Sequence, residues 1–199
     1  MELITTNRRD TGAEIVPYTP HAPHVAAALQ VLGTEFEFFK QYVPAKLYTN
    51  CSDQENKMRQ GKTRQTSLIL AAYGTEPVLQ TLKEHFVWLN LQNLYGWSDR
   101  EAAMFAMSLL RCEEARLLDW ISLLGFFRDI VDGRITLYAG NHRDVMQAFQ
   151  GYYKTAKLRE NELRTRLERE QEQATRKTEI LRGEAVAKII QQLKNEMGQ

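Results

Sequence analysis

The chain has 199 residues, with 43% hydrophobic and 26% charged residues, which is ordinary for a folded protein. Its two cysteines, Cys51 and Cys112, are too few for a disulfide framework and lie in no CxxC motif, which predicts a reducing cytoplasm. The net charge of +1 divides into about −2 over residues 1–153 and about +3 over residues 154–199. This balance permits contact with nucleic acid without demanding it.

Membrane association is not expected. The first ten residues, MELITTNRRD, lack the apolar stretch of a secretory signal. The most apolar stretch, residues 117–127, contains Asp119 and is too short to span a bilayer.

Residues 1–22 are polar, contain closely spaced prolines, and predict an extended arm. His21 and His24 form an HxxH pair, but the prolines beside them prevent a regular helix, so a solvated loop is favoured over a metal site. Apolar residues then repeat at helical spacing, which predicts one helix from Pro23, a first-turn proline, to the residue before Pro44.

Residues 45–66 are polar, with a short helix expected between Asp53 and Gln60. The sequence Gly61-Lys62-Thr63 matches the end of a phosphate-binding loop, but the first glycine of that motif is replaced by Asn56. A solvated basic loop is therefore favoured, and no cofactor is predicted.

Further helices are expected over residues 67–73, 75–94, 98–111 and 118–132. Ser98 and Glu101 form a capping box, the most specific local signal in the chain. Gly133 suits a C-terminal cap, residues 134–140 suit a loop, and Asn141 suits the N-cap of a long last helix.

No catalytic residue is predicted. His85 lies beside Phe86 on a strongly apolar helix, which favours a satisfied, partly buried histidine over a base. Glu113 and Glu114 are adjacent, so their side chains point about 100° apart on a helix and cannot act together. We therefore expect a protein without enzymatic activity.

The last helix divides into three parts. All nineteen aromatic residues lie at or before Tyr153, which predicts an all-α bundle over residues 23–153 and an appendage over residues 154–199. Residues 154–182 form a charged segment whose heptad pattern is poor: Leu167, Ala174 and Leu181 are one apolar series, but its partner series contains Glu170. Residues 184–197 form a separate amphipathic element.

Two candidate surfaces follow from this pattern. The first is the terminal apolar stripe, expected to bind a protein partner or a second copy: Val186, Ile189, Ile190, Leu193 and Met197. The second is a basic strip, expected either to contact nucleic acid phosphates or to be a solvated, ion-paired face: Lys154, Lys157, Arg159, Arg164, Arg166 and Arg169.

The order of features from Trp97 to Arg159 is distinctive: a helix opened by SDRE, an aromatic-ended helix closing with GFFRDIVDG, a loop tyrosine, and a helix with Phe149 and Tyr152. It resembles small all-α proteins encoded on bacterial phages and other mobile elements. The resemblance implies a place in DNA replication or element maintenance. Together with the end of the aromatic residues at Tyr153 and the charged helix after it, it predicts a non-enzymatic adaptor. The alternatives are a direct nucleic-acid binder and a structural component that self-associates through residues 184–197.

Overall fold

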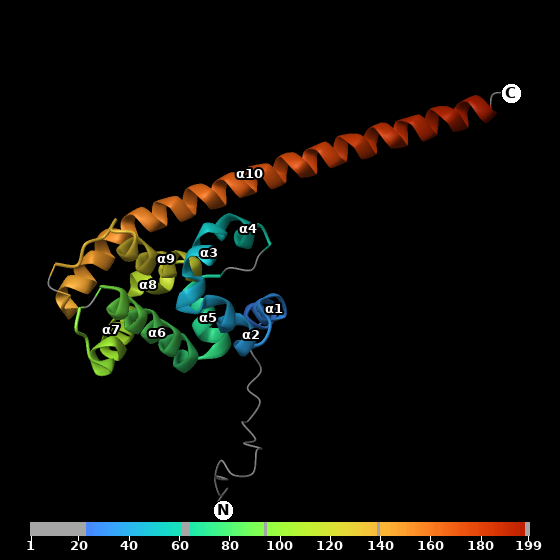
Figure 1. Cartoon of the computed structure of the whole chain (residues 1–199). Helices are drawn as coiled ribbons and strands as arrows, with labels where there is room; N and C mark the ends of the chain where they lie inside the picture. The colour runs from blue at the N-terminus through green and yellow to red at the C-terminus, as the bar shows by residue number, and fades with distance from the viewer. Residues whose placement is uncertain (1–22, 61–63, 94, 139, 198–199) are drawn as a thin grey trace, which may run out of the picture.

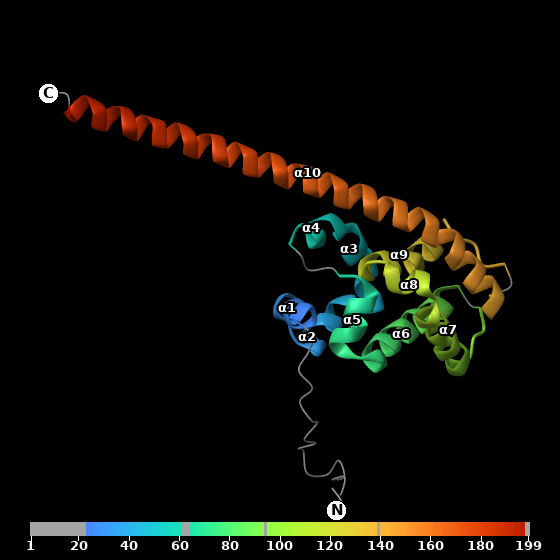
Figure 2. The same cartoon turned by 180° about the vertical axis from the view of Figure 1, so that it is seen from behind.

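A single helix of 56 residues, α10 (His142–Met197), lies along one side of a helical bundle and extends far beyond it (Figures 1 and 2). The computed structural model describes residues 23–60, 64–93, 95–138 and 140–197. Within these ranges the fold is all-α, as predicted, and its one β-type pairing is an isolated antiparallel bridge between Gln65 and Asp119. The predicted N-terminal arm, His21 and the Gly61-Lys62-Thr63 loop lie outside the described residues.

Nine α-helices and two short 3-10 helices precede α10 in the described ranges. They are α1 (Pro23–Leu32), α2 (Glu35–Phe39), η2 (Lys40–Tyr42), η3 (Pro44–Lys46), α3 (Leu47–Ser52), α4 (Gln54–Arg59), α5 (Thr66–Tyr73), α6 (Thr75–Asn93), α7 (Asp99–Arg111), α8 (Glu113–Leu117) and α9 (Trp120–Val131).

The core is centred on α6 and α9. Helix α9 contacts α3, α5, α6 and α10, so almost every residue from Trp120 to Ile130 is buried. Phe86 of α6 packs edge to face against Phe105 of α7 and Phe127 of α9. Buried aromatic pairs of this kind add about 0.5–1.5 kcal/mol beyond the burial of their area.

The single helix predicted between Pro23 and Pro44 is wrong. The chain turns at Gly33, whose φ of +84° suits glycine, and α2 starts after a second capping box, formed by Thr34 and Glu37. The turn rotates the following residues, so that Phe36, which one continuous helix would place on the buried face with Leu32, is 73% exposed.

Several other predicted boundaries agree with the structure, although α3 and α8 were not predicted. The capping box of Ser98 and Glu101 opens α7, and Gly133 follows α9 with a φ of +72°. The Asn141 side chain accepts a hydrogen bond from the Asp144 N–H at the start of α10 (3.0 Å). Helix α10 then continues through Gly183 without a break.

Candidate functional site: the stem and the free end of α10

Residues 142–170 of α10, here called the stem, contact the bundle. Val145, Phe149, Tyr152, Ala156 and Glu160 follow one another at spacings of three or four residues, so they lie on one face of the helix. All are buried except Tyr152, which is half-buried and donates a hydrogen bond to the Ser122 carbonyl. The contact between α10 and the bundle therefore continues past residue 153, where the aromatic residues end. Beyond that point Ala156 and the paired carboxylate of Glu160 take the place of aromatic side chains on the same face.

The close approach of α10 to α9 depends on Gly125. A Cβ atom at this position would lie 2.5 Å from the Tyr152 hydroxyl oxygen, which is closer than such atoms come in real structures. The glycine thus leaves room for the hydroxyl to reach the α9 backbone.

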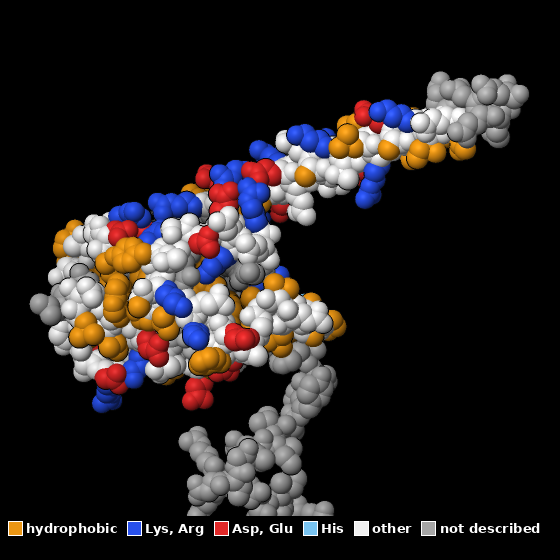
Figure 3. All heavy atoms as spheres, turned by 45° about the vertical axis from the view of Figure 1, so that its right-hand side comes forward, with side chains coloured by type: hydrophobic (Ala, Val, Ile, Leu, Met, Phe, Trp, Pro, Cys, Tyr) orange, Lys and Arg blue, Asp and Glu red, His pale blue; other side chains and the backbone are white. Residues whose placement is uncertain are grey.

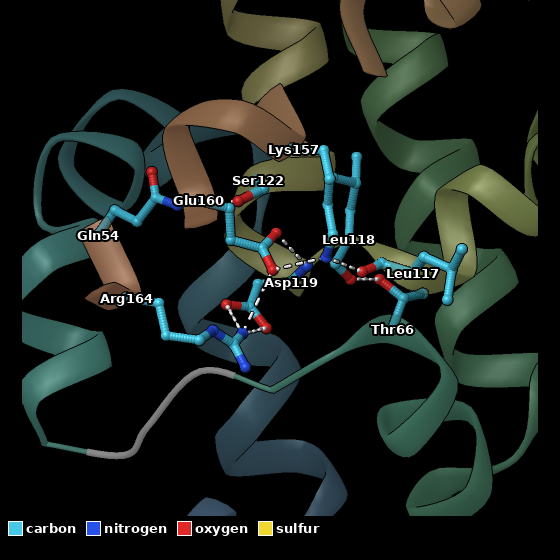
Figure 4. A network of polar contacts seen from close by, with 9 residues as sticks. All are labelled: Gln54, Thr66, Leu117, Leu118, Asp119, Ser122, Lys157, Glu160 and Arg164. Carbon is cyan, nitrogen blue, oxygen red and sulfur yellow. Dashed lines mark hydrogen bonds and ion pairs between the residues drawn. The ribbon is translucent and has the colours of Figure 1, made fainter. Parts of the chain in front are cut away.

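A buried polar network joins the stem to the junction between α8 and α9 (Figure 4). Leu118 and Asp119 have extended backbones, so their peptide groups are not bonded within a helix. Thr66 donates to the Leu118 carbonyl through its N–H (2.9 Å) and its hydroxyl (3.0 Å). The Asp119 N–H donates to Glu160 Oε2 (3.0 Å).

Two basic side chains of α10 complete the network. Lys157 Nζ donates to the Leu117 carbonyl (2.8 Å) and to Glu160 Oε1 (3.0 Å). Arg164 Nη2 bridges both carboxylates, at 3.2 Å from Asp119 Oδ2 and 3.3 Å from Glu160 Oε1. Glu160 is fully buried, so the network fixes where α10 crosses the junction and in which direction it continues.

Burial and, to a smaller extent, the neighbouring Glu160 carboxylate outweigh the lowering effects of Arg164 and Lys157 and raise the pKa of Asp119 from 3.8 to about 6. Although Asp119 stands directly before α9, its side chain does not cap that helix. Its carboxylate is turned instead to Arg164. The folded protein can hold the ionised form of Asp119, but this charge does not contribute to the stability of the fold.

An exposed ion-pair cluster joins α4 to the end of the stem. Arg166 pairs with Glu55, and Arg59 pairs with both Glu55 (3.0 Å) and Glu170 (2.5 Å). These side chains are about half exposed, so each pair contributes little by itself. The cluster marks the last recorded ion pair between α10 and the bundle along the described helix.

A groove of about 920 Å³ lies beside this cluster, between α10, the end of α4 and the start of α5. Met58 and Leu68 line it from the bundle, and Leu167 and Ala174 line it from α10. Asp119 and Arg164 reach its wall, so the buried network borders the groove. Ala174 is the lining residue farthest along α10.

The basic strip is largely used inside the chain. Lys157, Arg164 and Arg166 pair with carboxylates as described, and Arg159 lies 3.9 Å from Asp129. Lys154 and Arg169 are exposed, with no ion pair recorded among the described residues. Binding of nucleic acid by these six residues stays a prediction.

Residues 175–197, here called the free end, extend beyond the groove. Val186, Ile189, Ile190 and Leu193 of the predicted stripe are between 48% and 55% exposed. The side chain of Met197 lies outside the described residues. Figure 3 shows hydrophobic side chains along the lower edge of the free end, on the side where the bundle lies. Partner binding by this stripe stays a prediction.

The described residues contain no group of three or more His, Cys, Asp and Glu side chains suited to a metal ion. His85 is fully buried, stacks on Phe127 and bonds through Nε2 to the Tyr42 carbonyl (2.8 Å). Burial lowers its pKa to about 4. This is the environment of a core histidine, but the burial is complete rather than partial, and its Nδ1 atom has no hydrogen-bond partner among the described residues. Sequence reasoning missed the roles of Asp119 and Glu160, although the spacing of Glu160 after Tyr152 and Ala156 placed it on the buried face.

Comparison of this chain with protein-family models, curated proteins and solved structures found no match. None of the described helices combines the length and the apolar composition that crossing a bilayer requires.

Proposed function

We propose that the protein is a non-enzymatic interaction protein: the bundle holds α10 in a fixed direction, and the free end binds another helical protein surface. The observation that carries this proposal is the half-exposed stripe of Val186, Ile189, Ile190 and Leu193 beyond the last contact with the bundle. Helix-in-groove and helix-on-helix contacts use this spacing of apolar anchors.

The free end also needs a partner for its own stability. A helix that packs against nothing is marginal in water, because nucleation is costly and each i,i+4 ion pair adds only about 0.2–0.5 kcal/mol. Glu172 and Arg176 can form such a pair, as can Glu184 and Lys188, yet neither replaces packing. Burial of the stripe by a partner supplies the missing contact.

We place this interaction in a phage or mobile element, in DNA replication or maintenance. This setting rests on the resemblance of residues 97–159 alone. The buried network supports the mechanical part of the proposal. It directs α10 away from the bundle at one angle, so a partner bound at the free end is held at a set distance. From Glu170 to Leu193 that distance is about 35 Å at 1.5 Å per residue.

We expect the double substitution Ile189→Asp/Ile190→Asp to abolish complex formation while the free energy of unfolding of the bundle changes by less than about 0.5 kcal/mol, since both side chains lie outside the core. The measurement is co-purification of untagged protein with a tagged full-length chain, followed by mass spectrometry.

The matched control is Ile180→Asp. Ile180 is 61% exposed on the same free end, but it lies nine residues before Ile189 and so points to the opposite side of α10 from it. The control should keep the bound protein. Equal retention by Ile189→Asp/Ile190→Asp and by wild type would remove the stripe as the binding surface.

A further inference from the structure

We propose that the protein binds a phosphate monoester of a small, hydroxylated molecule in a hollow between α3 and the end of α9. This hollow is separate from the groove beside α10 and from the free end, so the inference goes beyond the proposed function. Three observations carry it: a largely buried arginine with few partners, an excess of guanidinium groups over carboxylates, and hydroxyl groups that line the same hollow.

The hollow has a volume of about 500 Å³, which lies within the range of roughly 300–1,000 Å³ that is usual for small-molecule sites. Helix α3 supplies three hydroxyl side chains, and the end of α9 with the loop after it supplies the charged ones. The lining residues are Tyr48, Thr49, Ser52, Arg128, Asp132 and Arg134. Because the hollow is much larger than a bare phosphate ion, the ligand that fits it carries an organic part as well.

Arg128 is a largely buried cation with few partners. Its side chain is 22% exposed, and the ion pair recorded for it, from Nη2 to Asp129 Oδ1, is long at 3.5 Å. Its Nε atom is buried and has no hydrogen-bond partner among the described residues. Such buried polar groups are rare, and binding of an ion is one of the reasons for which a protein keeps one. A guanidinium can donate two parallel hydrogen bonds to two oxygens of a phosphate group.

Guanidinium groups outnumber carboxylates in the cluster around Arg128. Arg134 pairs with Asp129 (2.9 Å) and with Asp132 (3.3 Å), and Arg159 of α10 lies 3.9 Å from Asp129. Three arginines therefore share two carboxylates, which leaves one positive charge of the cluster unbalanced. This excess favours an anion, and a phosphate monoester carries about 1.5 to 2 negative charges at neutral pH.

The C-terminal end of α9 opposes an anion only weakly. The partial negative charge of a helix end belongs to carbonyl groups that lack a hydrogen bond. Here the carbonyls of residues 128–130 accept hydrogen bonds from N–H groups of residues 132–135 at 2.8–3.0 Å. The guanidinium groups therefore dominate the electrostatics of the hollow.

The remaining polar groups of the wall suit the rest of such a ligand. Thr49 is exposed, and no hydrogen bond of its hydroxyl is recorded among the described residues, so this hydroxyl can donate to a phosphate oxygen. Asp132 is held by Arg134 and by the Tyr48 hydroxyl. These two donors use part of the roughly four lone-pair positions of a carboxylate. The other positions can accept hydrogen bonds from hydroxyl groups of the ligand.

Isothermal titration calorimetry of the full chain with adenosine monophosphate and with glycerol phosphate tests the proposal. Both compounds carry a phosphate monoester and hydroxyl groups, and adenosine and glycerol are the matched compounds without phosphate. We expect at least one phosphate compound to bind at a single site and its unphosphorylated match to give no binding. Equal binding of the matched compounds would overturn the proposal, as would the absence of binding by both phosphate compounds at millimolar concentration.

Arg134→Gln and Arg159→Gln form a matched pair, because both side chains are exposed (58% and 60%) and both contact Asp129. Of the two, Arg134 lines the hollow. We expect Arg134→Gln to weaken binding by about tenfold or more, and Arg159→Gln to weaken it by less than about threefold. Thr49→Val changes an exposed side chain, so it should leave the fold intact and weaken binding by about threefold. Equal weakening by both arginine variants would show a general attraction of anions and overturn the site.

Nucleic acid is the competing occupant of the hollow. A short oligonucleotide without terminal phosphates carries phosphate diesters and no monoester. If only the oligonucleotide bound, and Arg134→Gln weakened that binding, the hollow would contact a nucleic acid backbone and the proposal would be wrong. Ile189→Asp/Ile190→Asp should bind the phosphate compounds as wild type does, since the hollow lies on the bundle. Loss of one function therefore leaves the other unaffected.

Discussion

Replacement of Glu160 by alanine is expected to lower the free energy of unfolding by roughly 3–5 kcal/mol, the typical cost of removing one partner from a buried charge network. The Glu160 carboxylate accepts hydrogen bonds from the Asp119 N–H and from Lys157, and it lies 3.3 Å from Arg164. Alanine leaves a buried backbone N–H without an acceptor. Chemical denaturation of wild type and variant measures the difference.

Two further substitutions show whether the cause is the network. Glu160→Gln keeps an acceptor for the Asp119 N–H and should lose clearly less stability than alanine. Glu162→Ala removes an exposed carboxylate of the same helix and should change stability by no more than about 0.5 kcal/mol. If Glu160→Ala costs no more than Glu162→Ala, the network does not hold the stem on the bundle.

Asp119→Asn is expected to stabilise the protein at high pH. The pKa of Asp119 is raised from 3.8 to about 6 in the folded protein, so the folded state binds a proton more tightly than the unfolded state does. The contribution of Asp119 to the free energy of unfolding is therefore fully present below pH 3.8 and is lost as the pH rises to about 6. At about 1.4 kcal/mol per pKa unit the loss is about 3 kcal/mol, and asparagine, which stays neutral, avoids it.

His85 titrates in the opposite sense over nearly the same range. Its pKa is lowered from 6.5 to about 4 by burial, so its stability is present above pH 6.5 and is lost as the pH falls towards 4. In wild type the pH dependence of stability that comes from Asp119 and the one that comes from His85 largely cancel. In Asp119→Asn the His85 slope remains alone, and stability should fall steeply below pH 6.5.

Denaturation midpoints between pH 4 and pH 8 test this prediction. Asp119→Asn should match wild type near pH 4 and exceed it by up to about 3 kcal/mol at pH 8. Asp99→Asn, which changes an exposed carboxylate paired with Lys83, is the control and should show no such divergence. A variant less stable than wild type at pH 8 would mean that the ion pair with Arg164 outweighs the cost of burying Asp119.

Local patterns predicted much of this fold because they act within a few residues. The capping box of Ser98 and Glu101 and the cap at Asn141 follow from neighbouring side chains. The continuity of α10 through Gly183 was not predicted, since the sequence separated residues 184–197 as an element of their own. The same kind of signal, Thr34 followed by Glu37 after Gly33, was present at the turn between α1 and α2. The apolar residues keep their helical spacing across that turn, so the sequence predicted one continuous helix and the capping box was missed.

The candidate site was harder to predict because its contacts join distant residues. The i,i+4 spacing of Glu160 and Arg164 is typical of an ion pair on an exposed helix face. That pair exists, but both residues also contact Asp119, which lies 41 residues before Glu160. Glu162 and Arg166 have the same i,i+4 spacing, yet Arg166 pairs with Glu55 of α4 instead. Only the tertiary fold decides which face of a charged helix is buried.

Hydrogen–deuterium exchange along α10 is the most direct test of the central claim, that the stem belongs to the bundle and the free end is the interaction surface. In the co-purified complex, wild type should be protected along the whole helix. Ile189→Asp/Ile190→Asp should stay protected over residues 142–170 and exchange rapidly over residues 176–197. Equal exchange of the free end in both proteins, or rapid exchange of the stem, would contradict the account.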